Sequence, residues 1–315
     1  MQIRAIDLFC GAGGSSWGAR SSGVSIVAGF DAWKAAGAAF TSNFPAAEFF
    51  HSRLEDLSPR AIRRKLGPID LLLASPECTN HGPAKGASER SEQSRDTAFQ
   101  VPRFAEALAP RWIVIENVSG MRRWSRYAEL LKILGQLGYH VTAQVLNAAQ
   151  FGVPQRRRRL FLICDRAGPP PTIRPRKRPI LPASTVIDMN GTYRLSALRR
   201  EGRAAATIAR AERAITAVGA QRPFLLVYYG SDHAGGWQRL DASLRTITTL
   251  DRFALVKPSV QGHVMRMLQV PELKAAMGMP RAFSLGAGSR RQSIHLIGNA
   301  VCPPVMRAIV TALTR

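Results

Sequence analysis

The sequence predicts an α/β fold in which a mostly parallel sheet is accompanied by a smaller second domain. Three observations predict it. Short apolar runs that suit buried strands alternate with helical patterns through residues 3–164. A glycine-rich turn joins the first strand to the first helix. Six of the fifteen residues from Gly168 to Pro182 are proline, which indicates a linker that leaves the first domain.

Length and composition limit the class of protein. A chain of 315 residues with 46% apolar content can form one large or two moderate domains with a sizeable core. No apolar run reaches the roughly 18 to 20 residues of a membrane helix, and the first residues lead into a strand rather than a signal peptide. The four cysteines lie far apart. We therefore expect a soluble, cytoplasmic protein with reduced thiols, no membrane partner and no metal site.

Positive charge is concentrated in the second half of the chain. Residues 1–150 hold 17 basic and 13 acidic residues, whereas residues 151–315 hold 27 and 8. The balances are +4 and +19 of the total of +23. Such an asymmetry is typical of a polyanion binder, with nucleic acid the leading candidate, although an arginine-rich composition can also reflect genome base bias.

The first strand, Ile3–Phe9, runs into the turn Cys10–Gly14 and then a helix. Glycines in such a turn let the backbone approach a ligand closely. The third glycine of a dinucleotide fingerprint would fall at Ser16, which argues against a nicotinamide enzyme. The next strand, Val24–Phe30, leads to Asp31, where an acid can hold both hydroxyls of a ribose. The pattern indicates a nucleoside-bearing cofactor without a pyrophosphate.

The next elements lead to a candidate nucleophile. Ala38–Phe49 continues as a helix, a loop and a third strand, after which Asp56 is either a turn or cap residue or a cofactor contact. The apolar run Ile69–Ala74 predicts a strand buried on both faces, which Pro76 ends. Cys78 then stands at the root of a polar loop of about twenty residues, where open α/β sheets bind ligands. We interpret Cys78 as a nucleophile, although a lone cysteine is often only a small buried hydrophobe.

A second buried strand ends in a carboxylate. Thr97–Leu108 has helical spacing, and Trp112–Val118 then predicts a core strand that includes Glu116 and Asn117. An unpaired charge at the end of a core strand is costly. Glu116 is therefore placed for proton transfer.

A run of arginines separates two further strands. Tyr127–Leu137 predicts a helix, and His140–Asn147 and Leu160–Cys164 predict strands. Gln150–Arg159 lies between those strands and carries four consecutive arginines. Such a run is commonly a solvated surface, but a connector at this place faces the same end of the sheet as the candidate nucleophile.

The remainder of the chain is less informative. Residues 183–261 are basic and mixed, with one clear strand pattern at Pro223–Tyr229, and their fold does not follow from the sequence. Helical signals return at Val270–Met277, at Ile297–Val301 and at Pro303–Leu313.

Several of these motifs, in this order, carry a family resemblance. Together they resemble the DNA cytosine-5 methyltransferases over most of residues 1–165 and 262–315. The motifs are DLFCGAGG (Asp7–Gly14), ASPEC (Ala74–Cys78), ENV (Glu116–Val118), QRRRR (Gln155–Arg159) and GNAV (Gly298–Val301), with TITTLDRFALVKP (Thr246–Pro258) in support.

The resemblance implies a Rossmann-like sheet domain that depends on S-adenosylmethionine. Residues 1–165 would form the catalytic and cofactor-binding domain, residues 166–261 a target-recognition domain with its proline-rich linker, and residues 262–315 a segment that completes the catalytic domain. The implied substrate is cytosine in double-stranded DNA, rotated out of the stack at a cost of about a few kcal/mol. A cognate restriction endonuclease is a further partner that the family suggests, and we expect a monomer.

The resemblance also implies roles for individual residues. Cys78 would add to carbon 6 of the ring, Glu116 would bond ring nitrogen 3 and the amino group, and Arg159 would hold the carbonyl oxygen, with Arg157 as a structural or catalytic companion. The implied cofactor contacts are Phe9, Gly11, Gly13, Asp31, Asp56, Asn299 and Val301.

Two departures keep alternatives open. The family places proline directly before its cysteine, whereas Glu77 intervenes here between Pro76 and Cys78. The family stretch R-E-x-x-R-L-Q-G-F-P appears as Pro271–Pro280 without either arginine. The alternatives are an RNA cytosine-5 methyltransferase of the same fold and a catalytically silent DNA-binding relative.

Overall fold

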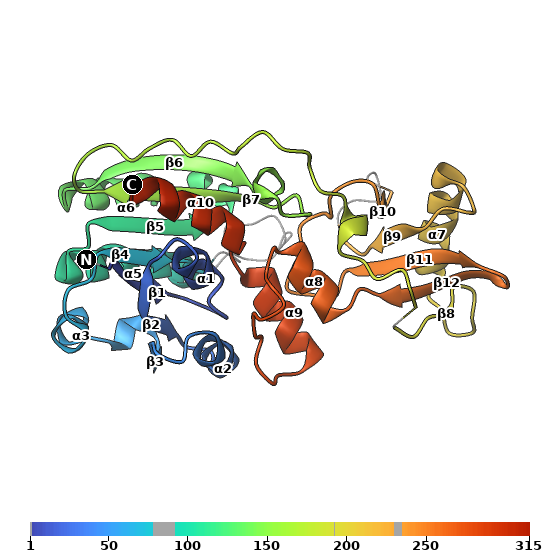
Figure 1. Ribbon diagram of the computed structural model, residues 1–315, viewed down its shortest axis with the longest axis horizontal. Helices are drawn as coiled ribbons and strands as arrows, with labels where there is room; N and C mark the ends of the chain where they lie inside the picture. The colour runs from blue at the N-terminus through green and yellow to red at the C-terminus, as the bar shows by residue number, and fades with distance from the viewer. Residues whose placement is uncertain (1, 78–91, 192, 230–234) are drawn as a thin grey trace.

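The computed structural model describes residues 2–77, 92–191, 193–229 and 235–315. The expected nucleophile, Cys78, lies outside the described residues. Figure 1 shows a larger lobe and a smaller lobe arranged along the long axis of the molecule, each built on its own sheet.

The first lobe contains a seven-stranded sheet in the order β3-β2-β1-β4-β5-β7-β6. Its strands are parallel except β7, which runs antiparallel to both of its neighbours. The strands are β1 (Arg4–Leu8), β2 (Ser25–Asp31), β3 (Glu48–His51), β4 (Leu71–Ala74), β5 (Trp112–Asn117), β6 (His140–Asn147) and β7 (Arg158–Asp165). The carboxyl ends of β1 to β5 and the amino end of β7 therefore meet at one edge.

Helices cover both faces of this sheet because its central strands are apolar on both sides. In β4, Leu71 and Leu73 enter one core cluster and Leu72 and Ala74 enter the other. Such alternation follows from the two-residue repeat of a strand. On the first face lie α1 (Gly14–Arg20), α2 (Lys34–Asn43) and α10 (Pro303–Leu313), and on the second lie α3 (Pro59–Leu66), α5 (Gln100–Leu108) and α6 (Tyr127–Gln136).

The second lobe is a five-stranded antiparallel sheet with one long helix on one face. The sheet order is β10-β9-β11-β12-β8. Its elements are β8 (Ser196–Ala197), α7 (Ala205–Val218), β9 (Phe224–Val227), β10 (Trp237–Arg239), β11 (Phe253–Ser259) and β12 (Gly262–Met267). Residues of α7 pack with one face of β9 and β11, while the other face joins the core cluster of the first lobe. The two lobes therefore share packed apolar surface.

The expected domain boundary at residue 261 falls inside a hairpin. β11 pairs with β12 from Ala254 opposite Met267 to Ser259 opposite Gly262. A hairpin of this kind belongs to one sheet, so the second lobe extends through Met267 and the chain returns to the first lobe afterwards.

The proline-rich segment follows the open edge of β6. The backbone amide of Ile173 donates to the side-chain oxygen of Gln144 at 2.8 Å, and Ile173 is buried. Figure 1 shows this segment running the length of the first lobe before it enters the second. The segment therefore covers an edge strand that would otherwise be unpaired.

The C-terminal part returns through α8 (Val270–Ala276) and α9 (Arg290–Asn299) to α10. Among the described residues, Arg290–Leu313 is one stretch with the length and hydropathy of a membrane span. It is divided between α9 and α10, and 61% of its apolar window is buried inside the fold. These residues form part of the core in the structure.

Candidate functional site

The polar residues expected to act together lie at the edge where the parallel strands end. Glu116 is the penultimate residue of strand β5, and Arg159 is the second residue of strand β7. β7 is antiparallel to β5, with Glu116 opposite Phe161. This register places an arginine from the beginning of one strand beside a carboxylate from the end of the other.

Glu116 and Arg159 form a nearly buried ion pair. Nε of Arg159 lies 3.1 Å from Oε1 of Glu116, and their side chains are 15% and 6% exposed. The contact lacks hydrogen-bond geometry, and within the described part of the chain Oε1 of Glu116 accepts no hydrogen bond. Burial raises the pKa of Glu116, while Arg159 and Arg157 oppose that rise. The carboxyl group thus keeps a bonding position for a ligand and a tendency to hold a proton.

The four arginines alternate between the protein interior and solvent. Arg157 is buried and Arg159 is mostly so, whereas Arg156 and Arg158 are exposed. Alternation of this kind is expected where a chain enters a strand. The run therefore divides into two inward arginines at the site and two outward arginines on the surface.

Arg157 is held by main-chain carbonyls from distant parts of the chain. Its Nη1 donates to Ile247 O at 2.9 Å, and its Nη2 donates to Gly298 O at 2.7 Å and to Ala300 O at 2.9 Å. Gln155 reinforces the junction by accepting from the Ile247 amide at 2.9 Å. These contacts make Arg157 a structural residue that joins the second lobe and the C-terminal segment to β7.

Asn117 has a role that the sequence analysis did not assign. Its Nδ2 donates to Pro76 O at 3.2 Å, and its Oδ1 accepts from the amide of Val118 at 2.8 Å. Asn117 therefore fixes the backbone that leads into the expected nucleophile. The only sequence signal was a buried amide directly after Glu116, at the end of a core strand.

The glycine turn after β1 has an open conformation that suits a ligand. Phe9, Gly11 and Gly13 have φ values of 58°, 53° and 87°, in the left-handed region that favours glycine. A Cβ added at Gly11 would have no atom within 4 Å, so the space beside this residue is open. The turn can therefore admit a ligand close to its backbone.

Asp31 holds this turn in place. Its Oδ2 accepts from the amide of Gly11 at 3.0 Å, and its Oδ1 accepts from the amide of Trp33 at 2.8 Å. Burial raises the pKa of Asp31, and these two hydrogen bonds oppose the rise. Each carboxylate oxygen keeps a second lone pair, so the same group can also accept from ribose hydroxyls.

The C-terminal motif packs directly on the turn. A Cβ at Gly14 would lie 2.5 Å from Val301 O, which shows how closely the two backbones approach. Val301 is buried, whereas Asn299 is exposed at the end of α9. The structure thus brings Val301 to the turn, while the expected contact at Asn299 stays a prediction.

A family model for C-5 cytosine-specific DNA methylases matches residues 3–315. The chain belongs to this family.

Curated relatives match about half of the chain. Type II methyltransferase M.AgeI of Thalassovita gelatinovora is 34% identical over 169 residues, which cover 51% of this chain and 39% of that protein. Type II methyltransferase M.HgiDI of Herpetosiphon aurantiacus is 30% identical over 168 residues, 53% of each chain. The chain spans about half the length of these curated relatives or less.

Solved structures share the whole fold at low identity. Entamoeba histolytica methyltransferase EhMeth superposes with a TM-score of 0.73 at 16% identity, covering 99% of this chain and 98% of that one. S. pombe Dnmt2 methyltransferase gives a TM-score of 0.68 at 15% identity, covering 99% and 98%. These likenesses support the α/β methyltransferase fold.

Asp56, which the family resemblance offered as a cofactor contact, is exposed in η1 (Leu54–Asp56). It borders an open cavity of about 500 Å³ between this segment and α5. Its role as a cofactor contact stays a prediction.

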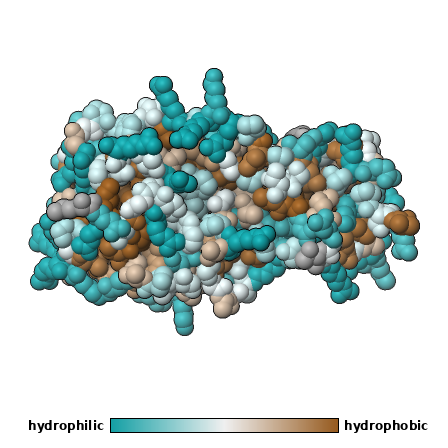
Figure 2. Space-filling view, in the orientation of Figure 1, coloured by the Kyte–Doolittle hydropathy of each residue, from teal (hydrophilic) through white to brown (hydrophobic). Residues whose placement is uncertain are grey.

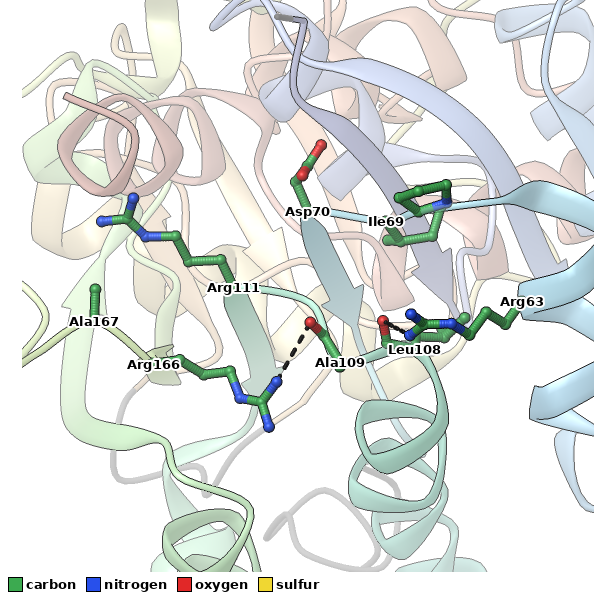
Figure 3. A pocket seen from close by; sticks show the side chains of 9 residues that line it. Arg63, Ile69, Asp70, Leu108, Ala109, Arg111, Arg166 and Ala167 are labelled. Carbon is green, nitrogen blue, oxygen red and sulfur yellow. Dashed lines mark hydrogen bonds between the residues drawn. The ribbon is translucent and has the colours of Figure 1, made fainter.

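Another cavity, of about 490 Å³, lies at the opposite edge of the methylase sheet and is lined by three arginines (Figure 3). Arg63 donates to Leu108 O at 2.7 Å and Arg166 to Leu137 O at 3.0 Å, while Arg111 pairs with Asp165 at 3.3 Å. Two of these guanidinium groups satisfy carbonyls at the ends of α5 and α6, as arginines near helix C-termini commonly do. Their arrangement is accounted for by helix capping.

Among residues 2–77, 92–191, 193–229 and 235–315, no group of three or more His, Cys, Asp or Glu side chains is placed to hold a metal ion.

Proposed function

We propose that this methylase transfers a methyl group from S-adenosylmethionine to carbon 5 of cytosine in double-stranded DNA. The observation that carries the proposal is the buried Glu116–Arg159 pair at the carboxyl edge of the sheet. Family membership supports the reaction class and implies the cofactor. We further propose a cytoplasmic monomer, with a cognate restriction endonuclease as a partner because the curated relatives carry Type II names.

The cofactor would lie at the turn after β1. The open space beside Gly11 admits a nucleoside, Asp31 would accept from its ribose hydroxyls, and Phe9 and Val301 would border it. When bound, S-adenosylmethionine supplies an electrophilic methyl group. Glycine is favoured at position 13, because φ is 87° there and an added Cβ would lie 2.5 Å from the ring of Phe44.

The target ring would lie against Glu116 and Arg159. Because burial raises the pKa of Glu116, its carboxyl group can donate a proton to ring nitrogen 3 as negative charge builds up there. Arg159 would hold the carbonyl oxygen of the ring and keep the carboxyl group oriented. Arg157 supports the pair through the main-chain contacts of the junction.

Cys78 is proposed as the nucleophile. Its thiolate would form a bond to carbon 6, and the electron pair of the 5,6 double bond would move to carbon 5, which takes the methyl group. Loss of the proton from carbon 5 would then free the electron pair of the carbon–hydrogen bond, which re-forms the 5,6 double bond as the sulfur–carbon bond breaks and its pair returns to the Cys78 thiolate. Asn117, which holds Pro76, would position the start of this segment.

DNA affinity would come mainly from the second half of the chain. Its balance is +19, and Figure 2 shows hydrophilic side chains projecting from the edge along which Figure 1 draws the proline-rich segment. Phosphate contacts position a duplex without reading its sequence.

Transfer of label from methyl-labelled S-adenosylmethionine tests the proposal. We expect 5-methylcytosine in duplex DNA and none in RNA. Label in RNA alone would support the RNA alternative, and no transfer to either would support a silent DNA-binding relative.

A duplex that carries 5-fluorocytosine tests the role of Cys78, because fluorine cannot leave as a proton does. Intact-mass analysis should show one covalent adduct with the unmodified chain. Retention of the adduct in Cys78→Ser would contradict the assignment.

A further inference from the structure

Asp7 is a fully buried carboxylate on β1, three residues before the turn proposed to bind the cofactor. Its Oδ2 accepts from the amide of Ser16 at 3.2 Å and from the hydroxyl of Ser16 at 2.6 Å. Its Oδ1 is buried and, within the described residues, has no hydrogen-bond partner. A carboxylate in this state is costly in an apolar interior, so its presence requires an explanation.

The surrounding elements offer Asp7 no positive charge among their described residues. Asp7 lies opposite Gly29 of β2 and Leu73 of β4. β4 has no titratable residue. The titratable groups that interact with Asp7 are Cys10 in the turn and Asp31 at the end of β2. α1 carries only Arg20, at its far end, where the guanidinium donates to Asn43 O.

Burial, together with the charge of Asp31, raises the pKa of Asp7 to about 7, and the two hydrogen bonds from Ser16 oppose that rise. The group therefore changes charge near neutral pH in the ligand-free protein. Any ligand that brings a positive charge to the neighbouring turn will favour the ionised form.

We propose that Asp7 is the counter-charge by which this turn selects the sulfonium cofactor over its neutral product. The inference rests on the proposed function. S-adenosylmethionine carries a positive sulfur, and after methyl transfer the sulfur of S-adenosylhomocysteine is neutral. A buried carboxylate distinguishes two ligands that differ by one charge because the interior screens that charge poorly. The same preference favours release of the product.

The pair of Asp7 with Ser16 also explains a departure noted in the sequence. Ser16 stands where a dinucleotide fingerprint has its third glycine, and its hydroxyl is committed to Asp7. A negative charge at this place repels a pyrophosphate. The carboxylate of Asp7 would therefore disfavour dinucleotide cofactors and favour a cofactor that carries a positive charge.

Isothermal titration calorimetry with both ligands tests the selection. We expect Asp7→Asn, which keeps the size of the side chain and an acceptor for Ser16, to lower the preference for S-adenosylmethionine over S-adenosylhomocysteine by about tenfold or more. Ser16→Ala removes a hydrogen bond that favours the ionised carboxylate, so it should lower the same preference, but by less than Asp7→Asn does. An unchanged ratio in Asp7→Asn would overturn the inference. Failure of the unmodified chain to bind either ligand would instead refute the proposed function.

The pH dependence of binding gives a second readout that needs no substitution. Below a pKa of about 7 the sulfonium ligand must displace the proton of Asp7, so its affinity should rise with pH through that value and then level off. Binding should release protons, measured in buffers of different ionisation heat. The neutral product should show neither effect from Asp7. Proton release of equal size for both ligands would contradict the proposal, even if Asp7→Asn does not fold.

Discussion

The two lobes hold their polar groups in different ways. In the first lobe, Glu116 and Asp7 are buried carboxyl groups, and burial raises the pKa of each. At the boundary of the second lobe, Glu272 is equally buried but is fully bonded: it accepts from both Nη atoms of Arg266 at 2.7 Å and from the amides of Asp188 and Gln269. The two buried carboxyl groups with an unsatisfied oxygen, Glu116 and Asp7, are those proposed to act in chemistry or ligand binding, whereas the carboxylate with all of its hydrogen bonds formed, Glu272, has a structural role.

The largest expected effect tests this difference at the proposed catalytic pair. Glu116→Gln and Arg159→Ala should lower turnover on the order of a hundred- to ten-thousandfold, because each removes a group assigned to the charge that develops on the ring. The affinity for duplex DNA should change far less, since neither residue is assigned to a contact with the DNA phosphates. Single-turnover rates and equilibrium binding separate the two quantities. Equal losses in both would place the pair in DNA binding.

The pH dependence of turnover follows from the same pair. Because burial raises the pKa of Glu116, its protonated form persists to higher pH than that of an exposed carboxyl group. Turnover should fall as pH rises through that pKa. The free energy of unfolding should also fall as pH rises through this range, because Glu116 keeps its proton in the folded protein after the unfolded chain has lost it.

Much of the first lobe was predictable from the sequence. β4 and β5 are continuous apolar runs because both of their faces are covered, and such runs are visible without any partner. The positions of Glu116 and Asp31 at strand ends followed from the same pattern. The contacts of Arg157 could not be predicted from that pattern, because its carbonyl partners lie 90 or more residues away in the sequence.

The second lobe could not be predicted for a physical reason. Its first strand, β8, pairs with β12 far along the chain, and several strands are short or half-exposed: β10 has three residues and β12 has two buried ones among six. A strand of that kind gains its stability from its neighbours. Helix α9 was identified only at its end, although Ser289 and Gln292 form a capping box that marks its start.

A further prediction concerns the exposed arginines beside the proposed catalytic pair. If roughly six to ten phosphates are contacted, DNA affinity should fall on the order of a thousandfold between 50 and 200 mM salt. Replacing the outward Arg156 and Arg158 by Gln should lower the slope of log affinity against log salt by about two. The matched control is Arg60→Gln with Arg64→Gln on α3, which should leave the slope unchanged. Equal reductions in both variants would mean that net charge, rather than position, determines the affinity.

The next prediction concerns the fully bonded network at the lobe boundary. Arg266 and Glu272 are each 4% exposed, and Arg266 supplies a cation to a stretch that lacks the two arginines of the family pattern. Arg266→Met alone should destabilise the protein by about 3 to 5 kcal/mol, because it leaves Glu272 as an unpaired buried charge. Arg266→Met combined with Glu272→Leu should recover most of the loss. Urea unfolding measures both variants, and full additivity of the two changes would contradict the pairing.

The smallest expected effect is at Glu77, the residue that interrupts the family pattern before the proposed nucleophile. Like charges a few ångströms apart would disfavour the thiolate of Cys78, which would slow the enzyme. A side chain next in sequence to a strand-end residue tends to project the opposite way, however, and Glu77 is exposed.

We therefore expect Glu77 to order its segment through a cation and not to act on the sulfur. Iodoacetamide alkylation of Cys78, followed against pH, should give the same apparent pKa in the unmodified chain and in Glu77→Gln, while turnover falls modestly. Cys78→Ser is the control that identifies the alkylated site. A clear downward shift of the apparent pKa in Glu77→Gln would show that the carboxylate acts on the thiol directly, and would make Glu77 part of the chemistry of the first lobe.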